Sequence, residues 1–115
     1  MRAEIRGVHL SLTEEIKDYV EKHLIAPFQH FYKDEAAEMV ITLRDANGPK
    51  GGMDKECRVT VHMPHFSTIQ ITETSEDIYK SVCFARDRLE RVVKREVQKH
   101  RADSRVYQND ARSIS

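Results

Sequence analysis

A line of cationic and aromatic side chains near the end of the chain is the sequence feature best suited to chemistry. Its members recur every three or four residues, which places them on one stripe of an α-helix. Guanidinium groups pair with phosphate through two parallel hydrogen bonds, and an exposed ring offers a base a stacking face. The spacing therefore predicts a helical surface that binds nucleic acid. This basic stripe consists of Phe84, Arg88, Arg91 and Arg95, flanked by Lys80, Lys94 and Lys99.

The positive charge is local. With 19 basic and 19 acidic residues the chain is formally neutral, which argues against binding polyanions through its overall field. Residues 86–101, however, hold seven basic and three acidic residues, a net charge of +4. Long cationic side chains are also normal on a solvated helix, and this competing interpretation of the stripe stays open. If the chain binds an anion, it binds it through this segment.

Other chemistry is poorly supported by the residue pattern. His62 and His65 form an HxxH pair, but no second clustered ligand pair exists, so we expect no metal site. No histidine has a nucleophile or a paired carboxylate beside it in sequence, and no glycine-rich phosphate loop is present. Cys57 and Cys83 suit reduced cysteines better than a disulfide framework. We therefore expect neither an enzyme nor a cofactor.

Two amphipathic helices are predicted to flank a run of strands. Thr13 is a suitable N-cap, and apolar residues then recur at helical spacing as far as Leu24, with an end or kink expected at Pro27. The second helix should begin at a Ser75 cap and bury an apolar seam that includes Val82 and Leu89.

Alternating apolar residues predict the strands. They occur at 39–44, 57–63 and roughly 66–72, and a short first strand falls within 1–10. The glycine-rich segment 47–52 should be a turn. The order β-α-β-β-β-α predicts an α+β domain, in which a four-stranded sheet has two helices on one face and a polar open face.

The length of 115 residues fits one domain, which we place at 1–101. Beyond it, 102–115 is polar and lacks the apolar periodicity, which indicates a flexible C-terminal tail. The longest apolar run is the four residues 82–85, and no secretion signal is evident. A cytoplasmic protein is the expectation.

Several short patterns together resemble one family. In their order and spacing, over 1–101, they are similar to the short form of the ribosome hibernation-promoting factor and ribosome-associated inhibitor A family. The patterns are Ile5-x-Gly7-x-His9, Thr13, Tyr19–Leu24, Asp77–Tyr79, Asp87–Arg91 and Lys94-Arg95.

The resemblance implies a fold like the double-stranded-RNA-binding domain, bound in the decoding region of the small ribosomal subunit. There the protein would block messenger and transfer RNA, stop translation and preserve idle ribosomes in stress and stationary phase. The implied partners are the small subunit and its ribosomal RNA, with no membrane, no small-molecule substrate and a monomeric state. By the resemblance, the residues facing ribosomal RNA are Lys22, Arg88, Arg91, Lys94 and Arg95.

Some features depart from the family pattern or leave alternatives open. Val8, Val92, Glu96 and Val97 stand where basic or polar residues are usual, which points to weaker ribosome affinity. The tail resembles the inhibitor A extension, which lies in the messenger channel, but its sequence does not decide between promoting and opposing ribosome pairing. A stand-alone module for structured RNA would use the same stripe, and a protein-interaction domain would use the open sheet face.

Overall fold

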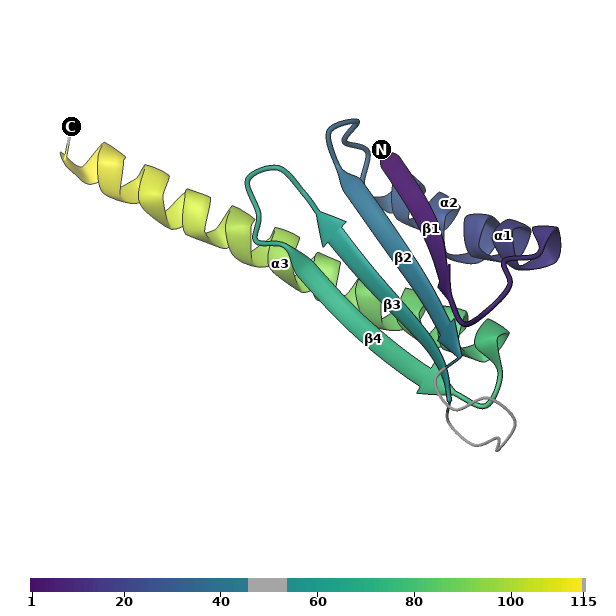
Figure 1. Ribbon diagram of the computed structural model, residues 1–115. Coiled ribbons are helices and arrows are strands. Elements are labelled where there is room, and N and C mark those ends of the chain that lie inside the picture. Colours follow the sequence, from purple (N-terminus) through teal and green to yellow (C-terminus); the bar gives the residue numbers. More distant parts are fainter. Residues whose placement is uncertain (46–53, 115) are drawn as a thin grey trace.

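The computed structural model describes residues 1–45 and 54–114, with side chains up to residue 99 (Figure 1). Within these residues the element order is β-α-β-β-β-α, because three consecutive helical segments form one continuous helical region. The elements are β1 (Arg2–Val8), α1 (Glu14–Val20), η1 (Glu21–Ile25), α2 (Ala26–Phe31), β2 (Glu38–Asp45), β3 (Lys55–His62), β4 (Ile69–Ser75) and α3 (Ile78–Ile114). The predicted α+β class is confirmed. The predicted turn at 47–52 lies outside the described residues.

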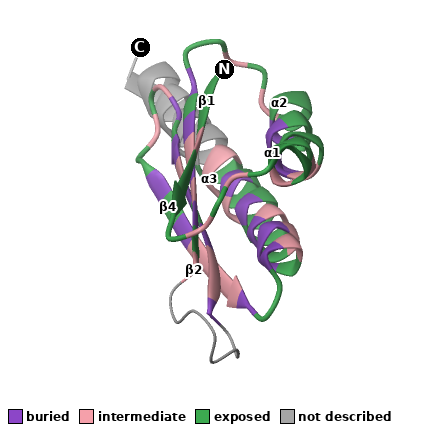
Figure 2. Ribbon diagram, turned by 45° about the vertical axis from the view of Figure 1, so that its right-hand side comes forward, coloured by how far each residue is buried: buried purple, intermediate pink, exposed green. Residues whose placement is uncertain are grey.

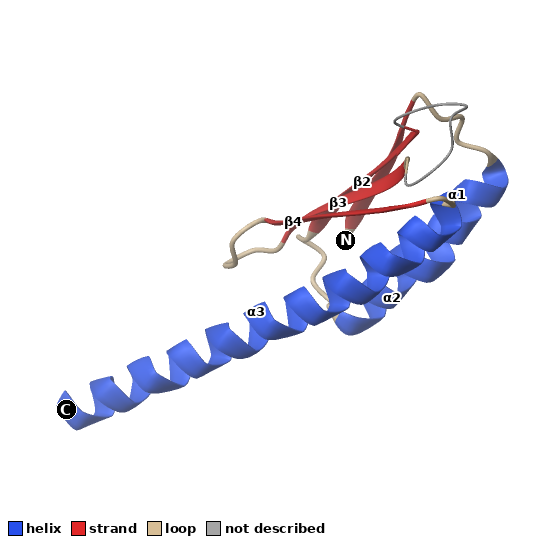
Figure 3. Ribbon diagram, turned by 90° about the horizontal axis from the view of Figure 1, so that it is seen from below, coloured by secondary structure: helices blue, strands red, loops and turns tan. Residues whose placement is uncertain are grey.

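The sheet has the strand order β1-β2-β3-β4. β1 and β2 are parallel, as a helical crossover between them requires, and the other two pairs are antiparallel. One cross-strand row shows the apolar face: Ile5 lies opposite Ile41, Ile41 opposite Val59, and Val59 opposite Ile71. All the helices cover this face, and the other face is open (Figure 3).

The hydrophobic core lies between the sheet and the helical layer (Figure 2). Val20 and Leu24 enter it from α1 and η1, and the predicted seam of α3 enters it from the same helical layer. Val82 and Leu89 are 1% and 2% exposed, which confirms the helical phase predicted for α3. The stripe on the opposite side of the helix is thereby turned to solvent.

The first helical region bends where the sequence predicts it. The Thr13 side chain accepts a hydrogen bond from the Ile16 amide at 3.2 Å, so it is the N-cap. Pro27 cannot donate to the carbonyl four residues earlier, and its ring crowds the preceding turn. The helix accommodates it with the wider π-helical turn η1, after which α2 begins at Ala26.

Two predicted boundaries are wrong by a few residues. β4 begins at Ile69 rather than near Phe66, because the Phe66 amide donates to the Met63 carbonyl at 3.1 Å and closes a turn. The helix cap is Asp77 rather than Ser75, since the Asp77 carboxylate accepts from the Tyr79 amide at 2.9 Å. Ser75 instead ends β4 and donates to the Asp77 carbonyl at 2.5 Å, which holds the turn.

The last helix is longer than the sequence pattern indicates. Its predicted end lies near Arg101, but α3 continues to Ile114. Residues 102–114 contain neither glycine nor proline, and extending an existing helix costs far less than nucleating one. The domain boundary after 101 and the flexibility of 102–115 stay predictions.

Candidate nucleic-acid interface

The four residues of the basic stripe and the three lysines that flank it are all exposed on α3, as the spacing predicts. Phe84 has 46% of its surface exposed, which is unusual for a large apolar side chain in this molecule. Because the buried seam anchors the other side of the helix, the stripe is presented on a rigid support. Lys22 is also exposed, but it lies on η1, so the structure does not place it on the stripe.

Arg88 is not a free cation. Its Nη1 donates to Glu73 Oε1 at 3.2 Å and to the Thr72 carbonyl at 3.4 Å, both on β4. The sequence shows no acidic residue on the stripe, because Glu73 comes from another element. The sequence did hold one signal of this pairing: Glu73 alternates in step with the inward-facing Ile69 and Ile71. Its carboxylate therefore faces the helix that packs on the strand, where a cation can pair with it.

Lys94 is held on the opposite flank of the stripe. Its Nζ donates to Glu90 Oε1 at 3.0 Å and lies 5.6 Å from the centre of the Phe31 ring on α2. In the described part of the chain, by contrast, Arg91 and Arg95 form no ion pair. The cations of α3 therefore differ in availability, and those without an acidic partner in these residues are Lys80, Arg91, Arg95 and Lys99.

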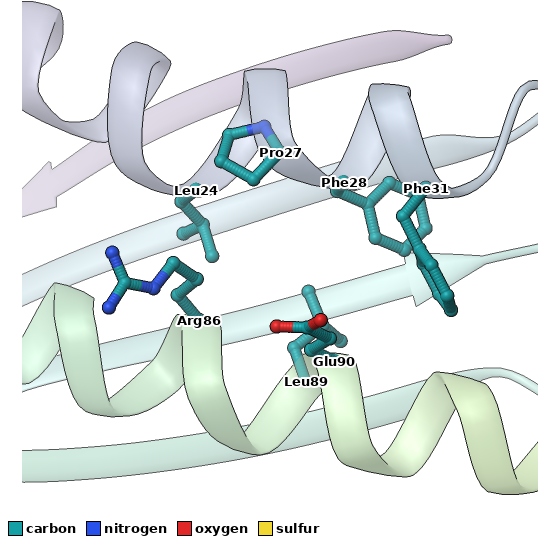
Figure 4. Close-up of a pocket in the computed structure, with 7 residues that line it drawn as sticks. All are labelled: Leu24, Pro27, Phe28, Phe31, Arg86, Leu89 and Glu90. Atoms are coloured by element: carbon teal, nitrogen blue, oxygen red, sulfur yellow. The ribbon is translucent and has the colours of Figure 1, made fainter.

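A groove separates α2 from α3 beside the stripe. Its cavity volume is about 70 Å³, and its wall on α2 includes Pro27 and Phe31 (Figure 4). Phe31 is 39% exposed although its spacing from Phe28 suits a core face. Sequence reasoning passed over Phe31 for that reason. The full lining is Leu24, Pro27, Phe28, Phe31, Arg86, Leu89 and Glu90.

The open face of the sheet carries arginines too. Arg6 and Arg58 share one cross-strand row with Thr42 and Thr72. Both arginines lie near a glutamate two residues earlier in their strands, at 3.1 Å for Arg6 and 3.7 Å for Arg58. Arg2 and Arg44 also lie on this face and form no ion pair with a described residue, so it carries two such cations against four on α3.

The cysteines sit in different environments. Burial raises the pKa of the Cys57 thiol to about 12, which makes it a packing residue and not a nucleophile. Cys83 is half-buried, and its Sγ lies 2.9 Å from the Tyr19 hydroxyl. That contact and burial raise the pKa of Tyr19. The Tyr19 ring also stacks on His23 and packs edge-on against Tyr79, so this cluster joins α1 to α3.

Among the side chains that the structure describes, no three His, Cys, Asp or Glu residues gather closely enough to hold a metal ion. No helix in the described part of the chain is sufficiently long and apolar to cross a bilayer.

Comparison with known families identifies the domain. Residues 3–101 match the family model described as sigma 54 modulation protein / S30EA ribosomal protein. The chain belongs to this family. The matched segment covers all four strands and the stripe on α3, so the family resemblance inferred from the sequence is confirmed.

Relatives within the S30EA family show how far the similarity extends. A ribosome hibernation promotion factor from Picosynechococcus sp. is 29% identical over 100 residues, which cover 87% of this chain and 51% of the relative. The chain thus spans about half the length of that curated relative.

Solved structures agree on the fold. The N-terminal domain of Thermus thermophilus Protein Y superposes with a TM-score of 0.67 and is 27% identical; the match covers 83% of this chain and 98% of that one. A ribosomal subunit interface protein from Coxiella burnetii, 22% identical, superposes with a TM-score of 0.65 over 83% of this chain and 96% of that one. At that identity, the second similarity supports the fold alone.

Proposed function

We propose that this protein binds the small ribosomal subunit in the decoding region and inhibits translation by occupying space that messenger and transfer RNA need. The observation that carries the proposal is the basic stripe, presented on a buried seam within a domain of the S30EA family. The name of the Picosynechococcus relative supports a role in ribosome hibernation. The protein would then act in the cytoplasm during stress and stationary phase.

The stripe would bind the phosphates of ribosomal RNA. Arg91 and Arg95 are the strongest candidates, because they are exposed and have no acidic partner in the described residues. Each charge-assisted contact would contribute about 1.5 to 3 kcal/mol. Phe84 offers a stacking face between the cations. The supporting cations are Lys22, Lys80, Arg88, Lys94 and Lys99.

Co-sedimentation with purified small ribosomal subunits tests the proposal. We expect the wild-type protein to sediment with the subunits and Arg91→Glu/Arg95→Glu to remain in the supernatant, because repulsion replaces two phosphate contacts. Arg44→Glu/Arg58→Glu is the matched control: it changes the charge equally, but on the open face. Circular dichroism should show both variants folded.

The control also separates the competing functions. Loss of binding only in the control variant would favour a protein-interaction domain that uses the open sheet. A salt titration also distinguishes the RNA-binding function from the protein-interaction function, because phosphate contacts weaken steeply with salt and an apolar interface does not. Equal binding by all three proteins would remove the stripe from the mechanism.

A further inference from the structure

The groove between α2 and α3 combines an apolar interior with an exposed aromatic wall. Leu24, Phe28 and Leu89 form its floor and are each less than 5% exposed. Pro27 and Phe31 rise from α2 at the solvent side, and Arg86 lies at the end away from Phe31 (Figure 4). A ligand in this groove would meet a flat ring and an aliphatic surface.

Unpaired positive charge adjoins the groove and does not line it. Among the described lining residues, the one carboxylate, Glu90, is paired with Lys94 at 3.0 Å, and Arg86 is paired with Asp87 at 3.1 Å. A second hollow, on which Lys33 and Lys94 lie, adjoins the groove at Phe31, the residue that lines both. Lys94 lines the second hollow but not the groove, which keeps the groove side of the Phe31 ring open.

We propose that this groove binds a nucleobase of single-stranded RNA, with Phe31 as the stacking ring and Lys94 as the contact to the adjacent phosphate. The inference rests on the proposed function, which it deepens by naming the part of the RNA that this surface takes. Aromatic rings beside a cationic track are the usual means of holding unpaired bases, since every base has a stacking face. Phe31 would supplement Phe84, which lies on the stripe itself.

Single-stranded RNA fits better than either a peptide or a free nucleotide. An apolar peptide would gain nothing from the cations on the rim, whereas a nucleotide joins a flat apolar base to an anion. The cations also continue beyond the groove: Arg91 and Arg95 lie on either side of Lys94 along α3. A single nucleotide would leave them unused, but an RNA chain places a phosphate at every step.

A short oligoadenylate with a central 2-aminopurine provides the probe, because the fluorescence of 2-aminopurine falls when it stacks. We expect quenching with the wild-type protein and with Phe31→Tyr, which keeps a ring. Phe31→Leu keeps an apolar side chain without a ring and should weaken binding about 5- to 150-fold, the range for loss of one stacked base. Val40→Ala, a half-buried apolar residue on the open face of β2, is the control and should bind as the wild type does.

A probe that is abasic at the central position completes the test. It should bind the wild-type protein about as weakly as the intact probe binds Phe31→Leu. Equal affinity of the intact and abasic probes would overturn the proposal and favour a protein occupant. Adenosine monophosphate binding as tightly as the oligonucleotide would overturn it too. Failure of the proposed function has a different signature: the wild-type protein would not sediment with small subunits, although the quenching would persist.

Discussion

The burial of Leu89 shows which side of α3 faces the core. It is 2% exposed and packs among the core residues of the sheet and helices. Leu89→Ala should therefore lower the free energy of unfolding by about 2 to 5 kcal/mol in denaturant melts. Phe84→Ala removes a larger side chain from the opposite side of the same helix and should cost less than about 0.5 kcal/mol. If Leu89→Ala lowers the free energy of unfolding by less than about 1 kcal/mol, Leu89 does not face the core and the stripe does not face solvent.

Cys57 makes stability depend on alkaline pH. Burial holds its pKa at about 12 in the folded protein, whereas an unfolded chain releases the thiol proton near pH 8.5. The unfolded state therefore binds fewer protons above that pH, and stability falls by up to about 1.4 kcal/mol per pH unit until the folded pKa is reached. Urea melts at pH 7 and pH 10 should show a smaller pH effect in Cys57→Ala. A pH effect of the same size in both proteins would contradict this assignment.

At the residue scale, the sequence revealed which side chains share a face but not their partners. The helical period alone places Arg91 and Arg95 opposite Leu89. The ion pair between Arg88 and Glu73 depends on how α3 lies across β4, and no local pattern encodes that. The exposure of Phe31 depends in the same way on the distance between α2 and α3.

At the scale of elements, that ion pair predicts a gain of function. Glu73 draws Arg88 toward β4 and adds negative charge beside the stripe. Glu73→Gln should therefore strengthen binding to RNA by a few-fold at low salt, with little effect on folding, because the pair is half-exposed and solvent screens it. Glu4→Gln makes the same charge change on β1 and should leave binding unchanged. Weaker binding by Glu73→Gln would indicate that the pair positions Arg88 for the RNA.

The helices and strands could be predicted from the sequence where a periodic apolar pattern is bounded by a residue that starts, bends or ends the element. Thr13 and Pro27 mark the start and the bend of the first helical region, and the strand alternation placed β2 and β3 to within a residue or two. The start of β4 was missed because the turn at Met63 and Phe66 uses backbone hydrogen bonds that many sequences can form. The end of α3 was missed because apolar periodicity indicates only the buried part of a helix. A helix can continue beyond the residues that pack against the core.

For the whole molecule, the part of α3 beyond the predicted domain boundary should separate the two proposed activities. The basic stripe ends at Lys99, whereas α3 continues to Ile114. Removing 102–115 should therefore leave binding to the small subunit nearly intact and weaken competition with messenger RNA more strongly. Filter-binding of labelled messenger to subunits, with and without the truncated protein, measures the second effect. Equal loss of both activities would place the anchoring contacts in the removed segment.

The proposed inhibition by occupancy predicts how many protein molecules are needed to stop a given number of ribosomes. A domain that only fills the decoding region can stop no more ribosomes than there are molecules of it. In a purified translation system, inhibition should therefore saturate near one protein per ribosome and reverse when initiation factors and transfer RNA are raised. Arg91→Glu/Arg95→Glu should shift the titration to higher protein concentration without changing its endpoint, because that variant binds more weakly but blocks the same space. Gel analysis should show intact ribosomal RNA throughout. Inactivation at substoichiometric protein, or RNA fragments that accumulate with time, would instead require a catalytic mechanism.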